Sequence, residues 1–339
     1  MKLFRRYLAY RLNKTILRSI VFTIFSVIIT WIVVHENVYG RKVSNKETGL
    51  YILAIVLGVI CTLIPILELS EFKNRRNLDT LYFFPIKREK MALVHFLSGF
   101  IQIVVIYTVT FISALIYLIS QTRYFALEYM IAYYFLSLIL GFMIYSIVAF
   151  FFVQGNTRAD GILFCVLWMP MLILVGSTVL DVLSQLVTVN YLDVIDSWGT
   201  IYSPINNLTE IFQYLIEVNK PHNHRTEMVS TYVSQMYMFF VWGTLGIAAA
   251  VGYFVTFVKK GAEKVGEISD SWFGYRVLIP IYAYCIFLDI GVQILLIDII
   301  VFALMVIGYV TYRRGFRLKL SDLIVIGCST WAIFLSEII

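Results

Sequence analysis

The feature that most constrains this chain is a series of apolar runs, each long enough to cross a lipid bilayer as a helix. Crossing the hydrocarbon core takes about 20 mostly apolar residues, and such runs recur from Ile16 to the end of the chain. Only 14% of the 339 residues are charged, whereas a soluble domain has about 25%. The sequence therefore predicts an all-α polytopic membrane protein with no soluble domain of useful size.

We expect six spans in a core of residues 1–258 and about three more in a C-terminal membrane extension of residues 259–339. The apolar run from Val277 to Tyr312 would measure about 54 Å as one helix, so we expect it to break near 288–293. The predicted core spans are 16–34, 50–67, 92–119, 127–153, 161–187 and 233–258, and those of the extension are 277–291, 294–312 and 320–338.

The N-terminal segment 2–18 is basic, with aromatic and leucine side chains between the charges. Leu3, Tyr7 and Tyr10 share one helical face, which predicts an amphipathic helix lying on the inner leaflet. With a cytoplasmic N-terminus, 21 of the 27 lysine and arginine residues fall in cytoplasmic segments. This bias follows the positive-inside rule and predicts a multi-pass protein of the cell membrane.

A charged island, residues 68–90, separates the second and third predicted spans. Pro85 disfavours continuation of a preceding helix, so we expect a short helix at 68–83 on the cytoplasmic surface. Its mixed charged and apolar side chains suit docking of a protein partner, although a solvated loop that only fixes topology is an alternative. The residues expected to make the docking contact are Glu71, Arg75, Arg76, Leu78, Asp79, Leu81, Tyr82 and Pro85.

Motifs for catalysis, nucleotide binding or metal binding are absent from the sequence. The nearest approach to a phosphate-binding loop is Gly261–Gly266, but Glu267 stands where that loop needs lysine. His222 and His224 lack neighbouring cysteines or carboxylates for a metal site. The four cysteines lie in apolar runs and are expected to be small buried side chains. We expect no catalytic residue, metal or cofactor in this chain.

Carboxylates near the apolar runs are further candidates, because charges inside a membrane are costly and are often functional. Most of them lie at span ends, where an interfacial position or a paired cation explains them. Asp298 lies inside a predicted span and is the candidate for proton coupling. The full set is Glu68, Glu128, Asp181, Asp289, Asp298 and Glu337.

Small residues occupy one face of the sixth predicted span, at Gly243, Gly246 and Ala250. Small side chains let helices approach closely in lipid. We expect this face to pack either within the chain or against a second subunit.

The stretch from Leu78 to Phe100, LDTLYFFPIKREKMALVHFLSGF, resembles the segment between spans two and three of bacterial ABC-2 type transporter permeases. In Phe84–Arg88, Phe and Lys replace the usual Leu and hydroxyl residue of that family's Leu-Pro-(Ile/Val)-(Ser/Thr)-Arg pattern. The basic N-terminus, Tyr202–Ile205 and Ala262–Arg276 are also similar to segments of such permeases.

The resemblance implies a six-span permease core that works with a second permease copy or paralogue. Separate ABC ATPase subunits would bind ATP and Mg²⁺ and would contact the charged island. It also implies an outer gate at Ser203 and Pro204. The cargo would be an amphipathic peptide, toxin, antimicrobial or lipid-like molecule, exported across the bacterial cytoplasmic membrane. The alternative is a proton-coupled transporter or channel that uses intramembrane carboxylates; no nucleic-acid partner is expected.

Overall fold

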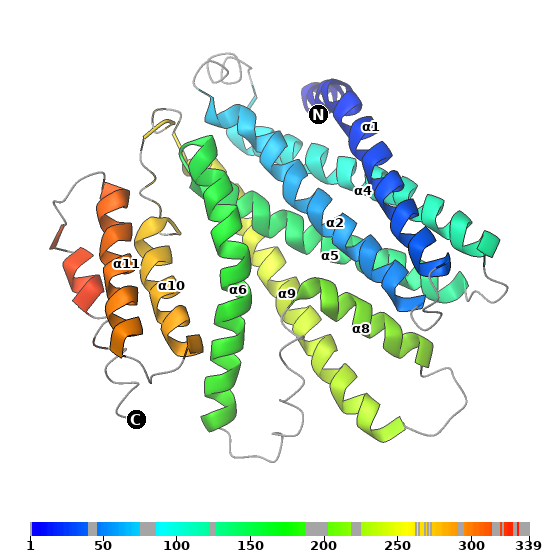
Figure 1. Cartoon of the computed structure of the whole chain (residues 1–339). Coiled ribbons are helices and arrows are strands. Elements are labelled where there is room, and N and C mark those ends of the chain that lie inside the picture. Colours follow the sequence, from blue (N-terminus) through cyan, green and yellow to red (C-terminus); the bar gives the residue numbers. More distant parts are fainter. Residues whose placement is uncertain are drawn as a thin grey trace. The chain divides into compact units, whose positions relative to one another are not determined.

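Every regular element in the described part of the chain is a helix (Figure 1). The computed structural model describes residues 2–39, 46–74, 86–121, 127–186, 203–217, 225–261, 295–313 and most of 263–290 and 319–331. Within the last two ranges it omits residues 264, 268, 270, 272, 321 and 328–330. This confirms the all-α class that the sequence predicts.

The chain divides into two compact units, which differ from the sequence-based division at residue 258. The first unit joins Met1–Val153 to Val189–Val265, and the second joins Gln154–Thr188 to Gly266–Ile339. The first unit contains helices α1 (Lys2–Tyr39), α2 (Lys46–Leu69), α4 (Arg88–Gln121), α5 (Leu127–Gln154), α8 (Pro204–Glu217) and α9 (Arg225–Lys259). The fifth predicted span thus groups with the C-terminal extension.

Helix α1 is continuous from Lys2 to Tyr39, so the expected interfacial helix and the first span form a single element. The predicted apolar face is buried only in part, because Tyr7 is buried while Leu3 and Tyr10 are exposed. Nothing in the sequence of this segment breaks a helix, since it contains neither glycine nor proline before Gly40. At about 1.5 Å per residue, α1 exceeds the thickness of the hydrocarbon core.

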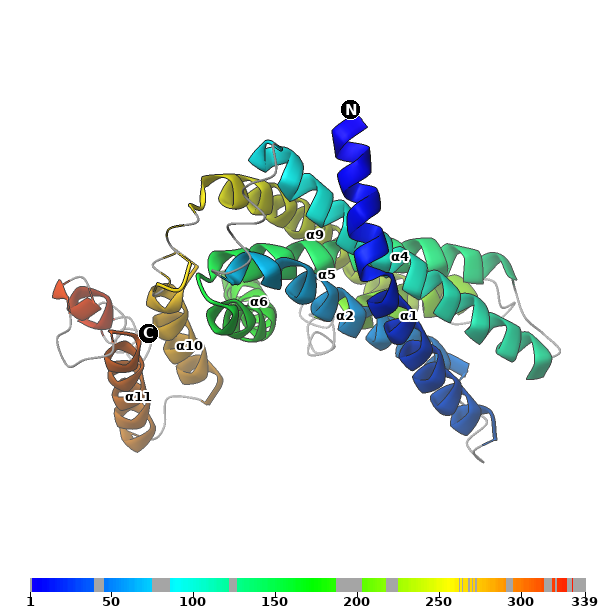
Figure 2. The same cartoon turned by 90° about the horizontal axis from the view of Figure 1, so that it is seen from above.

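Helix α1 lies beside α4, its main neighbour (Figures 1 and 2). Polar side chains of α1 contact α4, whereas many of its apolar side chains are exposed. Ser26 and Thr30 are buried, and the Ser26 hydroxyl lies 2.6 Å from that of Thr110 on α4. The outward face includes Phe25, which is 62% exposed. Lipid tails are as apolar as leucine, so helices in a membrane associate through close packing and polar contacts. The α1–α4 interface, here called the polar seam, has this character.

Five helices of the described part are long and apolar enough to cross a membrane. They are Leu3–Val33, Tyr51–Lys73, Arg88–Tyr117, Met130–Gln154 and Phe239–Lys259. This confirms a multi-pass membrane protein. The count of six core spans and three further spans stays a prediction.

The second unit contains α6 (Arg158–Leu186), α10 (Tyr275–Ile290), α11 (Leu295–Arg313) and a helical stretch at 322–327. The apolar run that seemed too long for one span forms two helices, as predicted, and both carry apolar residues into a small core. Hydrogen bonds tie α6 to this unit: Tyr275 donates to Asp160 at 2.8 Å, and the Trp168 indole donates to the Phe273 carbonyl at 2.7 Å. These bonds explain why the fifth predicted span groups with the C-terminal helices.

The charged island does not begin as a separate helix at Glu68. Helix α2 continues through Leu69, a 3₁₀ turn η1 covers Ser70–Lys73, and the backbone of Asn74 is extended. Residues 68–73 are helical, but they belong to the end of α2 and to η1. The extended conformation at Asn74 interrupts the predicted helix 68–83. Residues 75–85, including Pro85, lie outside the described residues.

The small-residue face of α9 packs within the chain, against α5. A Cβ atom placed on Gly246 would come within 2.9 Å of the Cα atom of Met143, and one on Gly243 would lie 3.2 Å from the Met143 methyl group. Ala250 is also buried. The close approach of Gly246 to backbone leaves no room for a larger residue.

Replacing Gly246 by valine is expected to destabilise the protein by about 1–3 kcal/mol through overpacking. Gly261→Ala is the control, because a Cβ atom there would meet only the Glu263 backbone nitrogen, at 4.0 Å. Thermal unfolding of the purified chain in detergent measures both. Equal melting temperatures for the two variants would contradict the close α5–α9 packing.

Candidate functional site

A cluster of charged side chains joins α1, α2, η1 and α4 at the inner end predicted for these spans. At its centre, the Glu68 carboxylate is fully buried and the Arg11 side chain is only 2% exposed. Arg11 donates from Nη2 to Glu68 Oε1 at 2.8 Å and from Nε to the same oxygen at 3.3 Å. Its Nη1 donates to Glu71 Oε2 at 2.6 Å. One guanidinium group thus bridges the end of α2 and the turn that follows it.

A second arginine completes the pairing of Glu68 from deeper along α1. Arg18 donates to Glu68 Oε2 at 2.5 Å and to the side-chain oxygen of Gln102 at 2.7 Å. Ser98 donates to Glu68 Oε1 at 3.1 Å, so α4 also supports the carboxylate. Both Glu68 oxygens are therefore held, and each of the three helices contributes to the arrangement.

His95 lies beside the carboxylate and is fully buried. Its Nδ1 is 3.3 Å from Glu68 Oε1 but makes no hydrogen bond of good geometry among the described groups. Its Nε2 lies 3.1 Å from the Tyr7 hydroxyl. The Phe72 ring packs edge-on against the imidazole, with centroids 4.5 Å apart. Aromatic rings therefore close off the side of the cluster next to η1.

The charges of this cluster nearly balance. Three cations (Arg11, Lys14 and Arg18) face two carboxylates (Glu68 and Glu71), and Lys14 donates to Glu71 at 3.0 Å. A buried charge is costly unless it is paired and hydrogen-bonded. Removing one member of such a buried pair typically costs about 3–5 kcal/mol, because the remaining charge is left without compensation. The cluster therefore fixes how α1, α2 and α4 meet.

Of the residues expected to contact a partner, Glu71 is the one that the structure describes, and it belongs to this cluster. It lies three residues before Asn74, after which residues 75–85 lead to α4. The others, Arg75, Arg76, Leu78, Asp79, Leu81, Tyr82 and Pro85, lie outside the described residues. Through Glu71, the N-terminal end of the predicted docking segment is thus bound to Arg11 of α1.

Ser203 and Pro204, the expected outer gate, stand at the start of α8. Pro204 is buried and is the first helical residue, a position where proline is favoured because its missing N–H would have no partner. The Ser203 carbonyl accepts from the Asn207 amide at 3.0 Å. In the described structure these two residues initiate a helix that packs on α2 and α9.

Within the described residues there is no group of three or more His, Cys, Asp or Glu side chains that could hold a metal ion. Cys61 and Cys165 are buried free thiols, as the sequence predicts. The side chains of Glu128, Asp181, Asp289, Asp298 and Glu337, and of His222 and His224, lie outside the described residues.

The sequence pattern held a signal for the cluster that the predictions did not use. Arg11, Lys14 and Arg18 are spaced i, i+3 and i+7, as are His95, Ser98 and Gln102. That spacing places each set on one helical face. These are two polar faces on otherwise apolar spans, and Glu68 lies at the end of another span. The pattern predicts that the side chains of the two faces pair with Glu68 and with one another.

Comparisons with protein-family models and with curated proteins each found no match for this chain.

Replacing Glu68 by leucine is expected to cost about 3–5 kcal/mol of stability, because Arg11 and Arg18 lose their common partner. Glu71→Leu is the comparison, since Glu71 is 24% exposed and its pairing is expected to contribute about 1 kcal/mol. The triple variant Arg11→Met, Arg18→Met, Glu68→Leu removes both charge types and should regain most of the loss. Unfolding by denaturant in detergent measures all three. A triple variant less stable than Glu68→Leu would contradict charge compensation.

Proposed function

We propose that this chain is the transmembrane permease subunit of an ATP-driven exporter of the ABC-2 type. The observation that carries the proposal is the buried ion cluster. It connects the start of the predicted docking segment, through Glu68 and Glu71, to Arg11 of α1 and to Ser98 of α4. A partner that moves residues 75–85 would therefore act on three spanning helices together.

The energy source is expected to be a separate ABC ATPase that binds ATP and Mg²⁺, because this chain lacks a phosphate-binding loop. Movement of the docking segment on ATP binding would shift α2 and α4, and the shared carboxylate would carry α1 with them. A second permease copy or paralogue would complete the route by which the cargo crosses the membrane. The cargo we propose is an amphipathic peptide, toxin, antimicrobial or lipid-like molecule, carried across the bacterial cytoplasmic membrane.

The alternative, a proton-coupled transporter, needs a carboxylate that exchanges protons during transport. Glu68 is a fully buried carboxylate, and it accepts hydrogen bonds from two guanidinium groups and a hydroxyl group. That arrangement suits a permanent ion pair that fixes helices. Glu68 therefore gives no support to proton coupling, whereas Asp298, the residue predicted for that role, lies outside the described side chains.

Affinity purification of the intact, tagged protein from its native membrane tests the proposal. We expect a P-loop ATPase to copurify, and Arg75→Glu with Arg76→Glu to reduce its recovery at least about tenfold, as loss of a binding hot spot does. Arg41→Glu with Lys42→Glu is the matched control, because it reverses two charges in the loop predicted to face outward. Undiminished ATPase recovery with the Arg75 and Arg76 variant, or absence of any copurifying ATPase, would refute the proposal.

A further inference from the structure

The imidazole of His95 is a titratable group inside the ion cluster, next to the contact between α1 and α4. Its side chain is fully buried, and so is the Glu68 carboxylate beside it. The Tyr7 hydroxyl of α1 lies 3.1 Å from its Nε2 atom. The Phe72 ring of η1 packs edge-on against it, with centroids 4.5 Å apart. A change in the charge of His95 would therefore act directly on the way α1 meets α4.

The position of Glu68 decides which imidazole nitrogen carries the proton of the neutral ring. Nδ1 lies 3.3 Å from Glu68 Oε1. A lone pair on Nδ1 would be repelled by the carboxylate oxygen, whereas an N–H group there is attracted to it. Nε2 then carries no proton and accepts from the Tyr7 hydroxyl. A further proton can bind only at Nε2, on the side of the ring that faces α1.

A proton on Nε2 would unbalance the charges that are fully buried. With a neutral His95, the buried Arg11 guanidinium and the buried Glu68 carboxylate are one cation and one anion. A protonated His95 would be a second buried cation beside Glu68 Oε1, which already accepts from Arg11 and Ser98. A buried charge that lacks its own partner is costly. The protonated state therefore favours an arrangement in which water reaches the cluster.

Titratable groups lie around His95 on each helix that borders it. They are Tyr7 and Arg11 of α1, Glu68 of α2, Glu71 of η1, Tyr253 of α9 and Tyr145 of α5. The two carboxylates are already paired with Arg11, Lys14 and Arg18. Phenols stay neutral well below pH 10. This set of described groups therefore holds no spare anion for a protonated His95.

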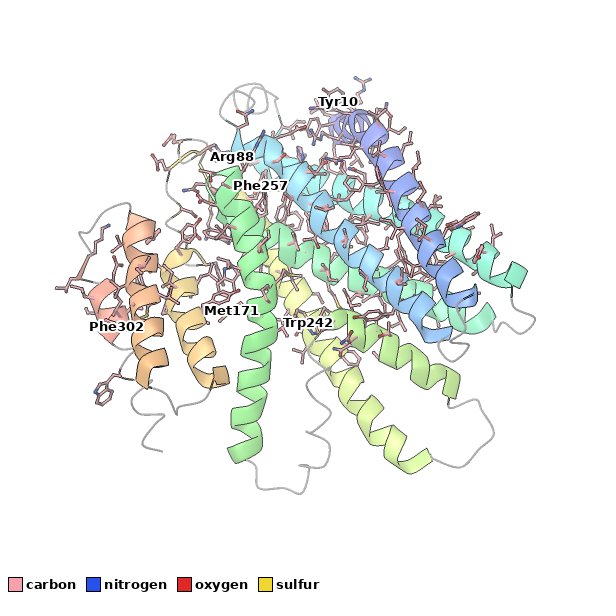
Figure 3. The ribbon with its side chains drawn as sticks, in the orientation of Figure 1. Tyr10, Arg88, Met171, Trp242, Phe257 and Phe302 are labelled. Carbon is pink, nitrogen blue, oxygen red and sulfur yellow. The ribbon has the colours of Figure 1, made fainter. Side chains whose placement is uncertain are left out.

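The Nε2 side of the ring lies close to the surface of the first unit. Tyr7 is buried, but its ring stacks on that of Tyr10, which is exposed, with centroids 6.5 Å apart. Figure 3 shows Tyr10 at the start of α1, the end predicted to be cytoplasmic. A small movement of Tyr7 would therefore open a route from the cytoplasm to Nε2.

We propose that His95 is a proton-binding site through which acidification of the cytoplasm releases the start of α1 from α4. At neutral pH the uncharged ring accepts from Tyr7 and the two helices stay in contact. A proton on Nε2 requires the Tyr7 hydroxyl to accept instead of donate, and it adds the second buried cation. Separation of the helices then admits water to both cations. The site does not depend on an ATPase or on the identity of the cargo.

Denaturant unfolding of the full-length protein in detergent, at pH 7.5 and pH 5.5, is the first test. Free histidine titrates near pH 6.5. Below that pH the unfolded chain binds one more proton than the folded chain, so stability falls as pH falls. The ratio of folded to unfolded protein should drop about tenfold between the two pH values. His95→Gln, which stays neutral, should remove this drop.

The matched control replaces the other three of the four histidines, His35, His222 and His224, by glutamine. This variant should keep the tenfold drop. His95 is then its only histidine, so ¹⁵N NMR of the labelled imidazole reports its protonation directly. At pH 7.5 the spectrum should show a neutral ring with the proton on Nδ1. That reading tests the site even where His95→Gln fails to fold.

A distance measurement separates release of α1 from a general loss of stability. Spin labels at Leu3 of α1 and Glu89 of α4, both exposed, report the separation of the two helix starts by double electron–electron resonance. In the triple-histidine control, a longer distance should appear at pH 5.5 under conditions where the protein remains folded. His95→Gln should keep the short distance at both pH values.

Three results would overturn the proton site. The first is an equal drop in stability in His95→Gln and the native protein. The second is a charged imidazole, or a neutral ring protonated at Nε2, at pH 7.5. The third is an unchanged distance between Leu3 and Glu89 at pH 5.5, which would leave His95 as a buried structural side chain.

Discussion

A carboxylate buried among three membrane helices must be compensated, and the rest of the first unit depends on how Glu68 is compensated. Arg11 and Arg18 hold its two oxygens from α1, and Ser98 supports it from α4. An unpaired buried charge would cost more than most single contacts supply. The positions of α1, α2 and α4 are therefore coupled, because moving one helix alone would expose a charge to an apolar environment.

The polar seam extends this coupling along the membrane. Ser26 and Thr110 contact each other between α1 and α4, well beyond the ion cluster. Helices that meet through polar contacts in lipid gain specificity of orientation, since apolar surface finds equally good partners in the lipid tails. The exposed apolar side of α1 is consistent with this environment. Together the seam and the cluster make α1 and α4 a paired element.

The helical class could be predicted from the sequence, because apolar runs of bilayer length leave few other structures possible. Five described helices are long and apolar enough to cross a membrane, and each overlaps a predicted span. The break between α10 and α11 was also predictable, from the length of the run that contains them. The N-terminal helix was predicted wrongly as a separate element. Its interleaved charges suggested a surface helix, whereas Arg11 and Arg18 are used internally, to compensate Glu68.

The candidate site was only partly predictable. Glu68 and Glu71 were named from the sequence as a span-end carboxylate and a docking residue, but their cationic partners on α1 are 50 or more residues away. Local pattern shows that His95, Ser98 and Gln102 share a face, yet it does not say which other helix that face meets. The same limit applies to α6: its hydrogen bonds to Phe273 and Tyr275 depend on tertiary packing that hydropathy does not report.

The central claim, which rests on the proposed function, is that Glu68 would transmit movement of the predicted docking segment to α1. Spin labels at Leu3, which is exposed on α1, and Glu89, which is exposed on α4, report their separation by double electron–electron resonance. In the proposed complex with an ABC ATPase, addition of ATP with vanadate should change this distance when Glu68 is intact. Glu68→Gln should abolish the change while the ATPase stays bound. An equal change in Glu68→Gln would contradict transmission through the ion cluster.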